Sequence, residues 1–127
     1  MIYDSTFFIA LERRRTREEA LGFLSCHADE PARLPAIVLG ELAVAFDSRE
    51  ELLEAIDPAY AIEPLTEEIA WHASRVQSVL ARRGQLMGEN DTWIAGFALY
   101  FDEPLVSRDT DYGKVVAAGL PLRWIRF

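Results

Sequence analysis

The stretch Gly88-Glu89-Asn90-Asp91-Thr92-Trp93-Ile94-Ala95 places two acids and an amide at the start of an apolar helical run. The run continues through residues 96–99, which are glycine, phenylalanine, alanine and leucine. A soluble domain has no structural need for so many polar side chains this close to its core, because burying them is costly. The stretch is explained if the helix start holds Asp91 against a positive charge. We therefore expect Asp91 to be one corner of a carboxylate cluster.

On both sides of this stretch, short apolar runs alternate with helical patterns. The runs with strand character cover residues 1–3, 34–39, 59–62, 105–107 and 120–125. Strands that alternate with helices indicate an α/β domain with a largely parallel sheet. We predict a single domain over residues 1–127, a three-layer α/β/α sandwich around a mostly parallel sheet of five strands.

Capping signals mark the starts of several helices. Thr16 and Ser48 each begin a capping box, and Thr66 begins the longest helix. The apolar stripe of this longest helix consists of Ile69, Ala73, Val76 and Leu80. Trp71 lies off the stripe, so we expect it to be exposed unless a neighbouring helix covers it.

Composition excludes several classes of protein. The chain has 127 residues, of which 50% are hydrophobic and 27% charged, as in ordinary globular domains. Its single cysteine, Cys26, excludes a disulfide framework and a cysteine zinc site. No apolar run approaches the roughly 18 residues of a membrane span, and Asp4 comes too early for a signal peptide. We expect a cytoplasmic protein without a membrane segment.

The charge pattern leaves nucleic-acid binding open. The net charge of −8 argues against binding driven by the charge of the whole protein. Arginines are nevertheless clustered at 13–15, at 17 and at 82–83, and local basic patches of this kind can bind RNA. The alternative is that both clusters are solvated helix ends.

Four acids occupy comparable places in the predicted layout. Asp4 follows the first strand, Glu41 the second and Asp109 the fourth, while Asp91 begins a helix. Ligands of open α/β sheets bind at the carboxyl ends of the strands, so these side chains should meet there. Each acid also has an ordinary alternative role, as a helix cap, a partner of a helix dipole or a turn residue.

Such a cluster is unfavourable without a cation, because like charges raise one another's pKa. Hard oxygen ligands suit Mg²⁺ or Mn²⁺, and the chemistry that follows is metal-assisted hydrolysis of a phosphodiester. His27 and His72 lack metal-ligand spacing to each other and to Cys26, so we interpret both as structural or surface residues.

Four motifs in order carry a resemblance to a known family. They are Ile2-Tyr3-Asp4-Ser5-Thr6, Gly40-Glu41-Leu42, Asn90-Asp91 with Ile94-Ala95, and Leu105-Val106-Ser107-Arg108-Asp109. Over essentially the whole chain, this pattern resembles the PIN-domain ribonucleases, in particular the bacterial VapC toxins. The resemblance implies a Mg²⁺- or Mn²⁺-dependent endoribonuclease acting on RNA such as tRNA or rRNA. It also implies a homodimer inhibited by a VapB-type antitoxin.

The resemblance assigns roles to individual residues. The metal-binding acids would be Asp4, Glu41, Asp91 and Asp109. The supporting residues would be Thr6 beside the first acid, Asn90 beside the third, and Asp111, which is also an alternative to Asp109 as the fourth ligand. The RNA contacts would come from Arg13, Arg14, Arg82, Arg83 and Arg108.

Two other classes of protein remain as alternatives. One is a non-catalytic module that binds RNA or a partner and keeps the acids as a relic, although the presence of all four acids argues against it. The other is a receiver-like phosphoacceptor domain, which would require an acidic pair near the first strand and a lysine after the last.

The segment after Glu41 is shorter than in many VapC proteins, which bears on the dimer and on the antitoxin groove.

Overall fold

The fold is built on a sheet of five parallel strands, seen in a computed structural model that describes residues 1–127. The strands lie in the order β3-β2-β1-β4-β5, and every neighbouring pair is parallel. Their bounds are β1 Ile2–Tyr3, β2 Ala32–Pro35, β3 Tyr60–Glu63, β4 Leu105–Val106 and β5 Trp124–Ile125. The predicted five-stranded parallel sheet is confirmed.

Seven helices connect and cover these strands. They are α1 Ser5–Glu12, α2 Arg17–Cys26, α3 Ala36–Ala43, α4 Arg49–Ala55, α5 Glu67–Arg82, α6 Glu89–Phe101 and α7 Tyr112–Ala117. None of them combines the length and the apolar character needed to cross a membrane.

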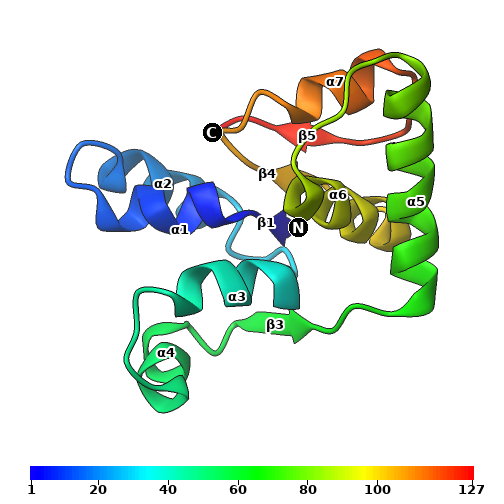
Figure 1. Ribbon diagram of the computed structural model, residues 1–127. Helices are drawn as coiled ribbons and strands as arrows, with labels where there is room; N and C mark the ends of the chain where they lie inside the picture. The colour runs from blue at the N-terminus through cyan, green and yellow to red at the C-terminus, as the bar shows by residue number, and fades with distance from the viewer.

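Helices pack on both faces of the sheet, because successive side chains of a strand point to opposite sides. Ile2 of β1 belongs to the larger apolar cluster, together with residues of α5, α6 and α7. Tyr3, the next residue, belongs to a second cluster with Phe7 of α1 and Ala20 of α2. Figure 1 shows α1 and α2 side by side, well away from α5 and α6. The predicted three-layer sandwich is therefore confirmed.

Helices α5 and α6 approach each other closely at Gly96. A Cβ atom at this position would lie 2.8 Å from the Cβ of Ala73 and 2.9 Å from the carbonyl oxygen of Ile69. Real Cβ atoms essentially never come this close to their neighbours. Glycine at 96 thus allows the apolar stripe of α5 to lie directly against α6, whose first turn carries Asp91.

The second strand and the helix after it differ from the prediction. The run 34–39 is not one strand, because β2 ends at Pro35 and α3 begins at Ala36. Proline has no N–H to continue a strand ladder, and its fixed φ suits a helix start. An apolar run of this length does not distinguish a strand from a buried helix. Glu41 consequently lies within α3 and not directly after a strand.

One strand boundary and one capping bond were predicted incorrectly. The last strand is only Trp124–Ile125, because the run from 120 contains Pro121, which cannot donate to a ladder. Thr16 precedes α2 without capping it. Its hydroxyl donates instead to the carbonyl of Ala10, at 2.9 Å, and so links α1 to the start of α2.

The other capping predictions are confirmed. The Ser48 hydroxyl accepts from the Glu51 N–H at 3.2 Å, and the Thr66 hydroxyl accepts from the Ile69 N–H at 3.4 Å. The four apolar stripe residues of α5 are buried, whereas the Trp71 side chain is 61% exposed.

Candidate metal centre and active site

Asp4 lies at the carboxyl edge of the sheet, directly beside the end of β4. The register pairs Tyr3 with Val106, so that Asp4 and Ser107 are neighbours. Asp4 is only 2% exposed, and its Oδ2 accepts hydrogen bonds from the Ser107 Oγ at 2.6 Å and the Thr6 Oγ1 at 2.9 Å. Its side chain makes no capping bond to α1. Two hydroxyl groups therefore hold the carboxylate, and helix capping does not explain it.

The same two hydroxyls tie the segment after β4 to Asp4. The backbone N–H of Asp109 donates to Ser107 Oγ at 3.0 Å, and the N–H of Arg108 donates to Thr6 Oγ1 at 3.1 Å. Thr6 was predicted as a supporting residue, whereas Ser107 was quoted only as part of a motif. The signal for Ser107 is its register with Asp4, which requires knowing how β1 and β4 pair.

Glu41 and Asn90 connect α3 to the start of α6. The Asn90 side-chain amide donates to Glu41 Oε1 at 2.8 Å. The other carboxylate oxygen, Glu41 Oε2, is buried and has no hydrogen-bond partner. A buried carboxylate oxygen without a donor is costly, and a cation beside it would remove that cost.

Asp91, in the first turn of α6, is surrounded by other carboxylates. Burial, as the larger cause, and the negative charges of Asp109, Asp4 and Glu41 together raise its pKa to about 6. Burial also raises the pKa of Asp4, against the lowering effect of the bonds from Ser107 and Thr6. The four acids predicted to form the cluster are thus near enough to repel one another.

Asp109 and Asp111 differ in how their carboxylates are used. One oxygen of Asp109 accepts from the Asp111 N–H at 2.8 Å, so Asp109 also holds the turn that was its alternative role. Asp111 forms an ion pair with Lys114 at 2.9 Å. Of the four carboxylates whose charges raise the pKa of Asp91, Asp109 raises it most and Asp111 least. The stronger effect of Asp109 on Asp91, together with the ion pair that engages Asp111, favours Asp109 as the member of the cluster.

This donor set fits a hard divalent cation. All its ligands are oxygens, one buried oxygen of Glu41 lacks a partner, and the carboxylates repel one another. Mg²⁺ and Mn²⁺ prefer such ligands and keep several of their waters. As the side chains stand, no group of three or more His, Cys, Asp or Glu residues forms a closed cage for an ion. The arrangement is an open one.

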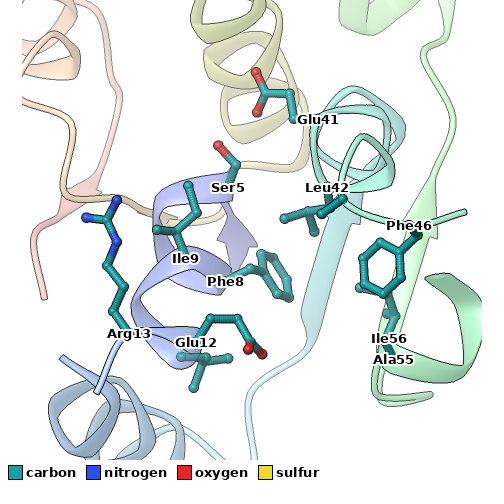
Figure 2. Close-up of a pocket in the computed structure, with 12 residues that line it drawn as sticks. Ser5, Phe8, Ile9, Glu12, Arg13, Glu41, Leu42, Phe46, Ala55 and Ile56 are labelled. Carbon is teal, nitrogen blue, oxygen red and sulfur yellow. The ribbon is translucent and has the colours of Figure 1, made fainter. Parts of the chain in front are cut away.

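A groove leads away from the acids. It has a volume of about 600 Å³, lies between α1, α3 and α4, and is lined mainly by apolar side chains. Figure 2 shows Ser5 and Glu41 at one end of it, and Glu12 and Arg13 at the other. The groove thus joins the acid cluster to the beginning of the first arginine cluster.

The arginines predicted to contact RNA fall into two groups. Those exposed to solvent are Arg13, Arg14, Arg82 and Arg83. Arg108 is already engaged, because its guanidinium pairs with Glu19 of α2 and lies 4.5 Å from the ring centroid of Phe127. Arg108 therefore fastens α2 and the C-terminal segment to the end of β4, and its charge is partly neutralised.

Comparison with known proteins places the chain in a family. The PIN domain family matches residues 1–118, and the chain belongs to this family. It is similar to the ribonuclease VapC5 of Mycobacterium tuberculosis, with 29% identity over 120 residues that cover 92% of this chain and 88% of the relative. The resemblance to VapC-type PIN domains is thereby confirmed, and the receiver-like alternative is removed.

Solved structures agree on the fold. The chain matches the structure of VapBC2 from Rickettsia felis bound to a DNA fragment from its promoter, with a TM-score of 0.80 and 18% identity, covering 99% of this chain and 98% of that one. It also matches FitAcB from Neisseria gonorrhoeae, with a TM-score of 0.77 and 22% identity, covering 94% of this chain and 93% of that one. At these identities the likeness concerns the fold.

Proposed function

We propose that this chain is a metal-dependent endoribonuclease, the toxin of a VapBC-type pair, which hydrolyses phosphodiester bonds in RNA such as tRNA or rRNA. The observation that supports this most is the acid cluster at the edge of the sheet. Its carboxylates repel one another, and the buried Oε2 of Glu41 lacks a partner. A relative that is named a ribonuclease adds support.

Each residue of the cluster has a role in this proposal. Mg²⁺ or Mn²⁺ would be held by Asp4, Glu41, Asp91 and Asp109. When bound, such an ion polarises the phosphoryl oxygen and supplies a nucleophilic water. Thr6 and Ser107 hold Asp4 through their hydroxyls, and Asn90 holds Glu41 through its amide. These bonds restrict the rotation of the carboxylates, which is what precise positioning of a scissile phosphate requires.

RNA binding would rest on the exposed arginines. The chain carries a net charge of −8, so attraction to phosphates must be local. Arg13 and Arg14 lie at the far end of α1 from Asp4, and Arg82 and Arg83 at the end of α5. An RNA strand that passes over the acids, from one arginine cluster to the other, would have positive charges on both sides. We leave Arg108 out of this set because of its pair with Glu19.

The partner would be a VapB-type antitoxin. The similar structures include complexes described as VapBC. The groove between α1, α3 and α4 offers an apolar surface that ends at Glu41, so an antitoxin segment bound in it would reach the acids.

Ala45→Arg, in the wall of the groove, should release inhibition by the antitoxin without abolishing cleavage. We also propose a homodimer, which light scattering on the purified chain tests.

The first experiment is cleavage of total RNA by wild type and by Asp4→Asn, each with Mg²⁺ and with EDTA. Asparagine keeps the size of Asp4 and can still accept from Ser107 and Thr6, so the variant should fold. We expect discrete cuts only in the wild type with Mg²⁺, and a loss of at least about a hundredfold in rate for Asp4→Asn.

Asp102→Asn serves as the matched control. Asp102 ends α6 in the left-handed region, at φ 50°, which asparagine tolerates, and its side chain is 90% exposed. This variant should cut like the wild type. If folded wild type with Mg²⁺ and without antitoxin makes no cuts, the nuclease proposal fails and the non-catalytic binding module takes its place.

A further inference from the structure

We propose that Tyr112 and Gly88 are positioning residues for Asp91, which fix its carboxylate between a hydroxyl on one oxygen and a bare Cα beside the other. This inference rests on the proposed function, because Asp91 is one of the acids that would hold the metal. Neither residue belongs to the predicted set of site residues.

Tyr112 begins α7 and is completely buried. Its ring belongs to the larger apolar cluster, a role that phenylalanine would fill equally well. Its hydroxyl, however, donates to Asp91 Oδ1 at 3.5 Å, and it is the only side chain that donates to Asp91. A buried tyrosine hydroxyl usually finds an acceptor, and for Tyr112 that acceptor is Asp91. The hydroxyl therefore gives Asp91 a neutral donor in surroundings otherwise dominated by carboxylates.

Gly88 precedes α6, and its backbone does not require glycine. Its φ of −53° and ψ of 148° are accessible to any residue. A Cβ atom at this position, however, would lie 2.5 Å from Asp91 Oδ2 and 3.5 Å from its Cγ. Any larger residue would push the carboxylate out of its present orientation. The glycine is thus explained by the space that Asp91 needs and not by the turn.

The hydrogen bond from Tyr112 and the space left by Gly88 together determine the orientation of the Asp91 carboxylate. Oδ1 faces the Tyr112 hydroxyl, and Oδ2 occupies the space that a side chain at 88 would fill. Removing the hydroxyl frees one side of the carboxylate, while adding a methyl group displaces the other. Both changes should weaken metal binding, and by different physical routes. Partners that orient metal ligands typically contribute about 10- to 100-fold in metal affinity.

The test is Mn²⁺ binding measured by electron paramagnetic resonance, in the absence of RNA, on wild type, Tyr112→Phe and Gly88→Ala. We expect the Kd for Mn²⁺ to rise about tenfold or more in each variant. The melting temperature in EDTA should change by no more than about 5 °C, because Tyr112→Phe keeps the ring and Gly88→Ala alters only a helix start.

Tyr60→Phe is the matched control for the loss of a hydroxyl. The Tyr60 hydroxyl is also buried, but it has no hydrogen-bond partner at all. Its removal should leave the Kd for Mn²⁺ unchanged. If Tyr112→Phe and Gly88→Ala bind Mn²⁺ as tightly as wild type does, the positioning role is overturned while the metal site stands. If wild type itself binds no Mn²⁺, the proposed function fails first.

Discussion

At the scale of residues, three acids of the candidate site are restrained in different ways. Asp4 is held by two hydroxyl donors, Glu41 by one amide, and Asp91 by a single long bond among repelling charges. The energetic cost of assembling the cluster is therefore concentrated at Asp91, whose pKa is raised to about 6. Removing the charge of Asp91 and removing a hydroxyl donor of Asp4 should consequently have opposite effects on the stability of the metal-free protein.

Asp91→Asn should stabilise the metal-free protein at pH 7.5. The pKa of Asp91 is raised from 3.8 to about 6, so the folded state binds the proton more tightly than the unfolded state does. Stability is then lost as the pH rises from about 4 to about 6 and Asp91 ionises. After allowance for solvent screening at this partly exposed group, asparagine should recover on the order of 1 kcal/mol at pH 7.5.

Urea unfolding in EDTA at pH 4 and at pH 7.5 measures this difference. The gain from Asp91→Asn should be present at the higher pH and nearly absent at the lower one. Asp102→Asn, which removes an exposed acid outside the cluster, should show no such pH dependence. A variant less stable than wild type at pH 7.5 would contradict the view that Asp91 is held against repulsion.

Ser107→Ala should have the opposite effect. Its hydroxyl donates to Asp4 and accepts from the Asp109 N–H, so alanine leaves a buried carboxylate and a backbone donor each short of a partner. We expect a loss of about 2 kcal/mol in the free energy of unfolding. Ser74→Ala removes an exposed bond to a carbonyl of its own helix and a long bond from the exposed Arg75 side chain, so it should cost less than about 0.5 kcal/mol. Equal effects of the two variants in urea unfolding would argue against the importance of Ser107.

At the scale of elements, the contact between α5 and α6 determines where the first turn of α6 lies. Gly96→Ala should destabilise the protein by about 2 kcal/mol, because its Cβ would overlap Ala73 and Ile69 and push the helices apart. Gly22→Ala is the control, since a Cβ there meets nothing within 4 Å in the middle of α2. That variant should gain about 0.5 to 1 kcal/mol from helix propensity. A stable Gly96→Ala protein in thermal denaturation would contradict the close approach.

The positions of the strands and helices, and the acids at their ends, could be predicted from the sequence only in part. Strand ends and helix starts carry Asp4, Asp91 and Asp109, and their meeting at one edge of the sheet follows from the rule for parallel sheets. The extent of α3 did not follow, because Pro35 divides an apolar run that has no period of its own. Ser107 and Tyr112 were missed as parts of the site because their contacts depend on strand register and on the rotation of a short helix.

At the scale of the whole molecule, the candidate site joins elements from every part of the chain. Its acids lie after β1, within α3, at the start of α6 and after β4, so a cation bound to them would connect segments far apart in the sequence. Such a cation would stabilise the folded state alone, since the unfolded chain does not bring these ligands together.

Thermal unfolding with Mg²⁺ and with EDTA tests this consequence for the whole molecule. At a free Mg²⁺ concentration a hundredfold above its Kd, the folded state gains about 2.7 kcal/mol, which should raise the melting temperature by about 10 °C. Asp4→Asn should lose most of this rise because the ligand charge is gone, whereas Asp102→Asn should keep it. Identical melting of wild type in Mg²⁺, Mn²⁺ and EDTA would mean that the acids repel one another without a cation to hold, and the metal proposal would then fail.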